Sequence, residues 1–214
     1  MDLSLQGVIP IPLLEKVKNR QSGIWNNTRS FNQGQYIFVQ APSGTGKTTL
    51  IHALYGLRKD YEGVVQWDTT SMKNVDAEIL SALRTKNISI IFQDMRLFPE
   101  LTTWENLELK RRQTNTVTEE QTSVWLERLG LKDKRNSLAS TLSYGEQQRV
   151  AIIRSLLQPF DWLLMDEPFS HLDHANTNKA IQLIAEVVAQ QNAGMLLADL
   201  DENSFFPYTQ TVIL

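Results

Sequence analysis

Cysteine is absent from this chain of 214 residues, which also lacks long apolar runs and a large excess of charge of either sign. Without cysteine the chain forms no disulfides and no thiolate metal sites, which fits a reducing compartment. No apolar run approaches the roughly 18 residues that a membrane-spanning helix needs. The formal net charge of −3 gives no electrostatic reason to expect nucleic acid as a main partner.

The composition is otherwise that of an ordinary globular protein. Apolar residues make up 42% of the chain and charged residues 21%, so a sizeable core can form. A chain of this length suits one domain, or one domain with an inserted lobe. Residues 1–6 start acidic and lack a basic segment followed by an apolar core, so we expect no secretory signal. If membranes matter to this chain, we expect it to reach them through a partner.

Short apolar runs rich in β-branched and aromatic residues recur along the chain. They occupy residues 35–39, 88–92, 162–165, 195–198 and 211–214. Their apolarity is continuous rather than alternating, which is typical of strands covered on both faces in a parallel sheet. Helical patterns lie between them, notably at residues 48–57, closed by Gly56, and at 176–190. This alternation predicts an α/β layer fold.

Residues 94–142 have a different character. They contain a predicted helix at residues 119–129 and no clear strand pattern. No internal repeat or low-complexity tract is visible, and each of the motifs described below occurs once. We therefore expect a mainly helical section inside the α/β layer.

The first apolar run leads directly into a phosphate-binding motif, Ala41-Pro42-Ser43-Gly44-Thr45-Gly46-Lys47-Thr48. Backbone N–H groups can surround phosphate oxygens only where side chains do not intrude, which explains Gly44 and Gly46. Lys47 is expected to reach the β- and γ-phosphates, and the Thr48 hydroxyl to ligate Mg²⁺. Thr48 and Thr49 open a helix whose N-terminal dipole favours the anion. The candidate nucleotide-binding residues here are Ser43, Gly44, Thr45, Gly46, Lys47, Thr48 and Thr49.

A second motif, Leu142-Ser143-Tyr144-Gly145-Glu146-Gln147-Gln148-Arg149, precedes a helical pattern at residues 147–157. Ser143 and Glu146 have the spacing of a capping box, in which the hydroxyl accepts from the Glu146 N–H and the carboxylate reaches back. A helix cap alone explains both residues without any ligand. Gly145 costs helix stability by about 1 kcal/mol. We interpret this glycine as permitting close approach of a phosphate to the helix N-terminus.

A third motif follows the apolar run at residues 162–165, where Asp166 and Glu167 stand side by side. At the C-terminal end of a parallel strand, side chains face the crevice where ligands bind. Two carboxylates after an apolar run are also compatible with a solvated loop.

The phosphate motif, residues 142–149 and the carboxylate pair occur in an order that resembles the ATP-binding cassette (ABC) ATPases. The three motifs extend over most of the chain. The resemblance implies an α/β P-loop NTPase with a RecA-like, mainly parallel core, an N-terminal β-rich lobe and an inserted helical lobe. It implies one nucleotide-binding domain over residues 1–214, with the core at about 30–93 and 155–214 and the helical lobe at about 94–154.

The resemblance also assigns roles. Glu167 polarises the attacking water, and Lys47 and Gln93 complete the catalytic set. Thr48, Gln93 and Asp166 are the metal candidates, toward Mg²⁺. Pro168 and the stretch Ser170-His171-Leu172-Asp173 resemble the next family motif, in which Asp173 contacts an opposing subunit. Ser143 and Gly145 are expected to complete the ATP site of that subunit, so two sites form at one head-to-tail interface.

The chain departs from the family pattern in several places. The phosphate motif begins with Ala41 rather than glycine, and Tyr144 stands where the family most often has glycine. Asp199 occupies the place of a histidine that contacts the γ-phosphate. The aromatic residue that stacks on adenine is missing near Lys18, and Trp25 lies too close to the loop. Asp199 predicts slow turnover and the missing aromatic predicts a loosely held base, whereas we expect ATP binding to survive the change at Ala41.

The resemblance predicts the ATP-hydrolysing subunit of a membrane transporter, active as a homodimer or in a paired cassette. Residues 94–106 resemble the segment that receives a helix of the transmembrane permease, with Leu97, Phe98 and Leu101 as apolar contacts. These three side chains could instead pack inside the helical lobe. The sequences of residues 94–106 and 142–149 are most similar to those of short bacterial cassettes of lipoprotein release, macrolide export and cell division. The expected location is the cytoplasmic face of the cell membrane, reached through the permease.

Two other functions stay open at this stage. One is a nucleotide-gated binding module that hydrolyses slowly or not at all; Asp199 favours it and Glu167 argues against it. The other is a soluble ABC ATPase of translation or DNA repair. Such proteins usually carry two cassettes or a long coiled-coil insertion, and this sequence has neither.

Overall fold

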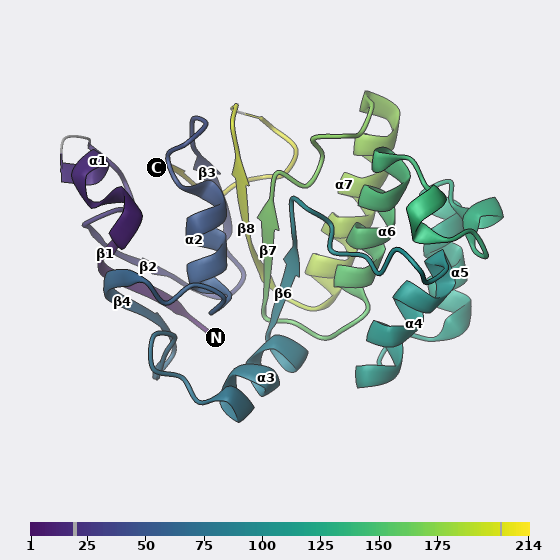
Figure 1. Cartoon of the computed structure of the whole chain (residues 1–214), viewed down its shortest axis with the longest axis horizontal. Helices are drawn as coiled ribbons and strands as arrows, with labels where there is room; N and C mark the ends of the chain where they lie inside the picture. Colours follow the sequence, from purple (N-terminus) through teal and green to yellow (C-terminus); the bar gives the residue numbers. More distant parts are fainter. Residues whose placement is uncertain (19–20, 202) are drawn as a thin grey trace.

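The computed structural model describes residues 1–18, 21–201 and 203–214. Its strands form two sheets, an antiparallel one in the order β2-β1-β4-β5 and a parallel one in the order β6-β7-β8-β3-β9 (Figure 1). The parallel sheet contains β3 (Tyr36–Gln40), β6 (Ile88–Ile91), β7 (Trp162–Asp166), β8 (Gly194–Asp199) and β9 (Gln210–Ile213). Every apolar run singled out in the sequence is a strand of this sheet, so the prediction of a parallel α/β layer is confirmed.

Both faces of the parallel sheet are covered, as continuous apolarity predicts. Along β7, Trp162 and Leu164 enter one core and Leu163 and Met165 enter the other. The first core includes α2 (Lys47–Leu54), and the second includes α6 (Tyr144–Leu156) and α7 (His174–Gln190). Figure 1 shows α2 on one side of the strands and α6 and α7 on the other.

The expected helices are present, with shifted ends. Helix α2 ends at Leu54, three residues before the predicted end, and Gly56 follows it in the left-handed region at φ 75°. The Gly56 N–H bonds to the Ala53 carbonyl and the Leu57 N–H to the His52 carbonyl, which closes the helix. Helices α6 and α7 begin earlier than predicted because their caps lie directly before the first helical turn.

The antiparallel sheet forms the N-terminal β-rich lobe. It contains β1 (Leu3–Pro10), β2 (Thr28–Phe31), β4 (Tyr61–Trp67) and β5 (Thr70–Ser71), and a short turn η1 (Ile11–Leu13) and helix α1 (Leu14–Lys18) follow β1. The Trp67 and Trp162 rings, 5.6 Å apart, join the two sheets. Strands β4 and β5 belong to this sheet although they fall within residues 30–93, so the proposed core boundary cuts across it.

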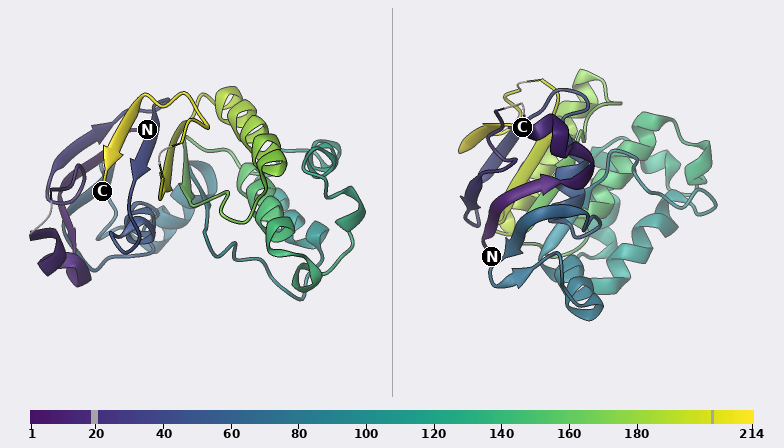
Figure 2. Two further views of the ribbon diagram at one scale, coloured as in Figure 1. Left: turned by 90° about the horizontal axis from the view of Figure 1, so that it is seen from above. Right: turned by 60° about the vertical axis from the view of Figure 1, so that its left-hand side comes forward.

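Helices dominate the section between β6 and β7. They are α4 (Thr103–Thr114) and α5 (Glu119–Arg128), with the short turns η2 (Lys132–Lys134) and η3 (Ala139–Thr141). Residues 94–142, all of which the structure describes, contain no strand. Figure 2 shows α4 and α5 standing away from the parallel sheet, beyond α6, while α3 (Ala77–Lys86) lies below β6 in Figure 1. The proposed limits of this lobe remain a proposal. No helix in the described part of the chain is long and apolar enough to span a bilayer.

Candidate nucleotide-binding site

The predicted site residues meet at the C-terminal edge of the parallel sheet. Strand β3 leads into the phosphate loop, β6 into Gln93, and β7 ends at Asp166. Strand β8 ends at Asp199, which pairs with Gln40 at the end of β3. This edge is where open parallel sheets bind ligands, and the strand register brings together residues far apart in the sequence.

The phosphate loop requires its glycines for two different reasons. Gly44 and Gly46 have φ values of 75° and 106°, in the region that favours glycine. A Cβ on Gly46 would also lie 2.7 Å from a Leu13 methyl and 3.2 Å from the Trp25 ring. Gly46 is the N-cap of α2 and supplies no side-chain cap, so no cap within the described part of the chain competes with an anion for the first N–H groups of the helix.

Lys47, Glu167 and Gln93 form one connected group. The Lys47 ammonium, 7% exposed, donates to the Ala41 carbonyl at 2.9 Å and pairs with Glu167 Oε1 at 3.1 Å. Gln93 Nε2 donates to the other Glu167 oxygen at 3.1 Å, and Gln93 Oε1 accepts from the Thr48 hydroxyl at 3.5 Å. The structure therefore unites the three candidate catalytic residues, which the sequence separates by up to 120 positions.

Glu167 has an unusual backbone for its residue type. Its φ of 46° is in the left-handed region, where non-glycine residues are uncommon. Its N–H donates to the Ala198 carbonyl on β8 at 3.0 Å, which holds this conformation. Such conformations persist where the surroundings enforce them, and they cluster at functional sites. The turn is what aims the carboxylate back at Lys47.

Asp166 lies buried beneath the phosphate loop. Its Oδ1 atom has no hydrogen-bond partner among the described residues. Burial raises the pKa of this carboxyl to about 6; contact with the Thr48 hydroxyl lowers it, and the Glu167 charge raises it further. A cavity of about 240 Å³ is lined by Thr48, His52, Gln93, Asp94 and Asp166. Hydroxyl, amide and carboxylate oxygens are the ligands Mg²⁺ prefers, so the orphaned oxygen fits a cation or its bound water.

Asp199 lies at the margin of this group. Its backbone carbonyl accepts from the Ala41 N–H at 2.9 Å, and its carboxylate accepts from the Leu200 N–H at 2.7 Å. Burial raises the pKa of Asp199, the Leu200 N–H lowers it, and the Glu167 charge raises it again. The Asp199 carboxylate is therefore close enough to Glu167 and Lys47 to interact with their charges. Its predicted position facing a γ-phosphate stays a prediction.

The predicted capping box at the start of α6 is confirmed. The Glu146 N–H donates to the Ser143 hydroxyl at 3.3 Å, and the Ser143 N–H donates to Glu146 Oε2 at 2.8 Å. For Gly145 the structure adds a reason that the sequence did not reveal, because a Cβ there would lie 2.9 Å from the His171 carbonyl. The glycine is thus needed for contact within the chain. A role toward phosphate remains a prediction.

Gln148 is a structural link that the sequence analysis missed. Its side chain, 1% exposed, donates to the Glu167 carbonyl at 3.4 Å and the Ser170 hydroxyl at 3.3 Å, and accepts from the His171 N–H at 3.0 Å. It therefore connects α6 to the turn that carries Glu167. Its place inside the motif at residues 142–149 was the available signal, and nothing local marked it as buried.

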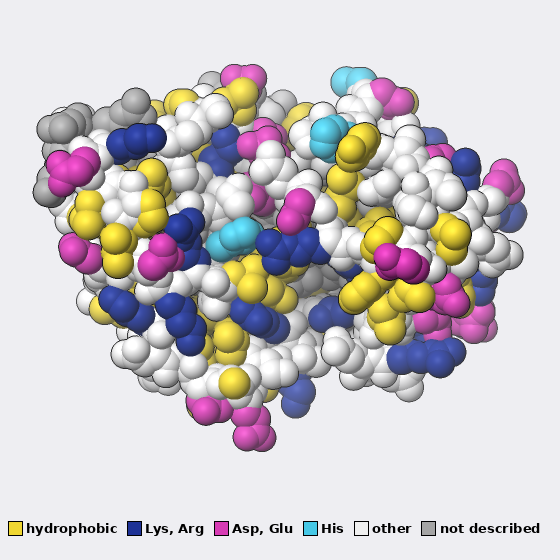
Figure 3. Space-filling model, viewed as in Figure 1, with side chains coloured by type: hydrophobic (Ala, Val, Ile, Leu, Met, Phe, Trp, Pro, Cys, Tyr) yellow, Lys and Arg dark blue, Asp and Glu magenta, His cyan; other side chains and the backbone are white. Residues whose placement is uncertain are grey.

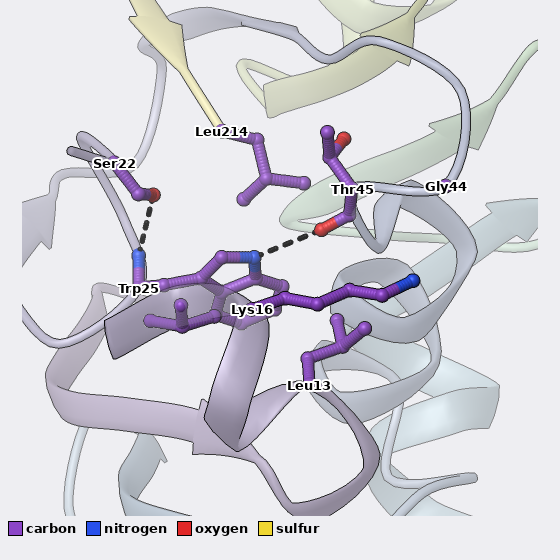
Figure 4. A pocket seen from close by; sticks show the side chains of 8 residues that line it. Leu13, Lys16, Ser22, Trp25, Gly44, Thr45 and Leu214 are labelled. Carbon is purple, nitrogen blue, oxygen red and sulfur yellow. Dashed lines mark hydrogen bonds between the residues drawn. The ribbon is translucent and has the colours of Figure 1, made fainter. Parts of the chain in front are cut away.

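Trp25 supports the phosphate loop. Figure 4 shows its indole N–H pointing at the Thr45 carbonyl, 3.1 Å away. The ring is 3% exposed, so it offers no open face for a base. It lines a small pocket together with Leu13, Lys16, Val17, Ser22, Gly44, Thr45 and Leu214. The expected base-stacking position falls at Lys18, whose side chain lies outside the described residues.

The fold and this edge of the sheet place the chain among the P-loop nucleotide hydrolases. Comparison with known proteins narrows the class, since the ABC transporter family matches residues 26–170. Over 176 residues the chain is 31% identical to the lipoprotein-releasing system ATP-binding protein LolD of Legionella pneumophila (strain Lens), covering 81% of this chain and 78% of that one. Over 177 residues it is 35% identical to the aliphatic sulfonates import ATP-binding protein SsuB 1 of Paracoccus denitrificans (strain Pd 1222), covering 82% and 66%.

The solved dimeric structure of MJ0796, a bacterial ABC transporter cassette, matches with a TM-score of 0.77 and 28% identity, covering 93% of this chain and 88% of that one. A second structure of that cassette, in a post-hydrolysis state with ADP and Pi, matches with a TM-score of 0.78 and 26% identity. The chain belongs to the ABC transporter family and is an ATP-binding subunit of the ABC ATPase class.

Proposed function

We propose that this ABC ATPase hydrolyses ATP with Glu167 as the group that polarises the attacking water. The observation that carries the proposal is the strained turn at Glu167, which holds its two oxygens against Lys47 and Gln93. The water oxygen bonds to the γ-phosphorus as the bond to the β–γ bridging oxygen breaks, and the products are ADP and inorganic phosphate. Glu167 accepts the hydrogen bond that orients this water.

The phosphates are held by backbone amides of residues 43–49 and by the Lys47 ammonium. Lys47 pairs with Glu167 at 3.1 Å, so its turning toward the phosphates frees one carboxylate oxygen for water. Thr48 and Asp166 would hold Mg²⁺, and Gln93, which contacts both the Thr48 hydroxyl and the Glu167 carboxylate, would help to hold the metal or the water. The bound metal would neutralise charge on the β- and γ-phosphate oxygens.

A second copy of the cassette, or a paired one, completes the site. Ser143 and Gly145 lie at the start of α6, and no hydrogen bond or ion pair among the described residues joins them to the phosphate loop of their own chain. Tyr144, 69% exposed, leaves its ring available to a partner. Asp173 caps α7 by accepting from the Asn176 N–H at 2.8 Å. At an interface it would cap this helix and also contact the opposing subunit. The dimeric solved cassette supports this arrangement.

We place the permease contact in a groove of about 380 Å³ between β6, α4 and α6. Phe98 and Leu109 line it and are 54% and 51% exposed, whereas Leu97 packs on the second core. Lys110 and Arg154 add two cations, and no carboxylate is among the described residues that line the groove. Dark blue and yellow side chains mark this area between α2 and α4 in Figure 3. This chemistry fits a permease helix with an apolar face and a carboxylate, which would hold the chain at the cytoplasmic face of the membrane.

The substitution Glu167→Gln tests this function. It keeps the shape and removes the charge that orients water, so turnover falls by roughly 10²-fold or more while ATP binding persists. With ATP trapped, the variant should run as a dimer in light scattering. Glu186→Gln, which alters an exposed ion pair with Arg128, is the control and leaves turnover unchanged. Full turnover in Glu167→Gln would exclude this role for the carboxylate.

One observation favours a second candidate, a nucleotide-gated module with slow hydrolysis. Asp199 brings a further carboxylate to the edge that binds phosphates, within electrostatic range of Glu167 and Lys47. In this alternative the closed, ATP-bound state is the working state. The steady-state rate of ATP hydrolysis by the wild-type chain with its permease distinguishes the two candidates, because a transport ATPase turns over repeatedly there, whereas a gated module stays in its ATP-bound state.

A further inference from the structure

The loop that follows Gln93 contains two consecutive strained residues. Met95 and Arg96 have φ values of 56° and 51°, in the left-handed region that bulky side chains disfavour. The turn is closed by the Met95 N–H, which donates to the Phe92 carbonyl at 3.1 Å, and by the Arg96 N–H, which donates to the Asp94 carbonyl at 2.5 Å. Both of these bonds lie within the turn, and two consecutive left-handed residues of this size persist only where the surrounding structure enforces them.

A single guanidinium from α6 grips the turn. Arg154 Nη2 donates to the Met95 carbonyl at 2.5 Å, and Nη1 donates to the Arg96 carbonyl at 2.6 Å. A planar fork of donors suits two neighbouring carbonyls, whereas a lysine ammonium is a point donor. Among the described residues, no carboxylate lies within ion-pair distance of Arg154. Burial lowers the pKa of this guanidinium to about 10, partly offset by Tyr55 and Asp94.

The turn begins one residue after Asp94 and two after Gln93, whose amide contacts both Glu167 and Thr48. Gln93 is exposed and no other described hydrogen bond holds its side chain, so the course of the backbone decides where its amide lies. An alteration of the turn therefore moves the amide relative to the catalytic carboxylate. Displacements of about 1 Å of this kind can cost roughly 10²-fold in rate.

We propose that Arg154 is a positioning residue for hydrolysis, which holds the Met95–Arg96 turn and thereby keeps Gln93 against Glu167 and Thr48. The proposal rests on the catalytic role proposed for Gln93 and Glu167. Arg154 belongs to α6, the helix that Ser143 caps, and its side chain lines the groove assigned above to the permease. The guanidinium thus connects α6 and the groove to the loop that carries Gln93. A partner that binds in the groove and moves Arg154 would therefore change the position of the Gln93 side chain.

The first test measures the turn itself and needs no turnover. Arg154→Lys keeps the positive charge but removes the pair of hydrogen bonds to the Met95 and Arg96 carbonyls. In hydrogen–deuterium exchange of the purified chain, the amides of residues 93–96 should exchange roughly tenfold faster, while those of β7 and α7 stay unchanged. Arg128→Lys, on α5 and paired with Glu186, is the matched control and leaves residues 93–96 as in the wild type. Unchanged exchange at residues 93–96 in Arg154→Lys would overturn the proposal.

The second test asks whether the grip acts through Gln93. Arg154→Lys should lower kcat roughly tenfold with little change in the Kd for ATP. In a Gln93→Ala background, the same substitution should have no further effect on kcat, because the two residues act as one unit. Multiplicative losses in the double variant would mean that Arg154 acts elsewhere and would refute the positioning role.

Two controls separate folding and function from positioning. Circular dichroism checks that the variant is folded; if Arg154→Lys does not fold, Arg154→Gln, which carries no buried charge, is measured in both tests instead. If the wild-type chain turns over no ATP, the proposed function fails, yet the exchange measurement still decides whether Arg154 holds the turn.

Discussion

Replacing Asp199 tests how charge at the edge of the sheet controls the rate. Hydrolysis spreads negative charge over the phosphoryl oxygens, and an ionised carboxylate beside them opposes it. Asp199 lies one residue before Leu200, whose N–H stabilises the ionised form, while burial and Glu167 favour the neutral form. Its backbone carbonyl accepts from the N–H of Ala41, the first residue of the phosphate motif, so we expect its side chain near the reacting group.

The size of the effect follows from Coulomb's law. At an effective dielectric near 20, one unit charge repels another by about 4 kcal/mol at 4 Å and about 2 kcal/mol at 8 Å. Since each 1.36 kcal/mol is tenfold in rate, removing the repulsion should speed hydrolysis roughly 30- to 1000-fold. Asp199→Asn removes the charge with the same shape, and Asp199→His adds a donor at the place where the family has histidine.

Phosphate release by the purified chain is the assay, with Asp201→Asn as the control because Asp201 is exposed. Both Asp199 variants should be faster than the wild type, and Asp199→His the fastest. Because the pKa of Asp199 is raised, the wild-type carboxyl is neutralised more readily in acid, so the ratio of the Asp199→Asn rate to the wild-type rate should shrink as pH falls. Equal rates for all variants, with and without the permease, would show that Asp199 does not face the phosphate.

Two further predictions concern the phosphate loop and the buried carboxylate. Lys47→Ala removes the cation that we expect to contact the phosphates, so calorimetry should show a sharp loss of ATP affinity; an unchanged Kd would refute the assignment of this loop. Asp166→Asn should raise the free energy of unfolding at pH 7 by roughly 2–3 kcal/mol, because the pKa of Asp166 is about 6 in the folded state and near 3.8 when unfolded. Between pH 4 and pH 6 the Asp166 carboxyl of the wild type is protonated in the folded state and ionised in the unfolded state. The free energy of unfolding of the wild type therefore falls as pH rises through this range, and the difference between variant and wild type should vanish near pH 4. Equal melting curves for the two proteins at pH 7 would contradict the burial argument, and unchanged hydrolysis in Asp166→Asn would exclude its role toward Mg²⁺.

The parallel sheet was predictable because its strands are buried on both faces and read as continuous apolar runs. The antiparallel sheet was expected only through the family resemblance, since its strands are not individually marked. Strand β2, Thr28–Phe31, has one buried residue, and the residues of β1 that pair with it are 22 to 28 positions away in the sequence. One local signal was overlooked. Thr102 and Glu105 form a capping box that begins α4, with the same spacing as Ser143 and Glu146.

Of the site, the sequence by itself determined the parts that depend on neighbours a few residues apart. These are the glycine conformations of the phosphate loop, the cap of α6 and the order of the motifs, because turns and caps are made by bonds within one turn of chain. The tertiary structure alone decided that Lys47, Gln93 and Glu167 meet, because strand register brings residues from three strands to one edge.

The same holds for contacts that no motif encodes. Gly145 faces the His171 carbonyl, and Arg154 holds carbonyls nearly 60 residues away. Such contacts arise when helices and loops pack against each other, and their partners carry no periodicity or spacing that a sequence displays. The local motifs therefore determine which functional groups this protein has, whereas the tertiary structure determines how these groups are positioned relative to one another.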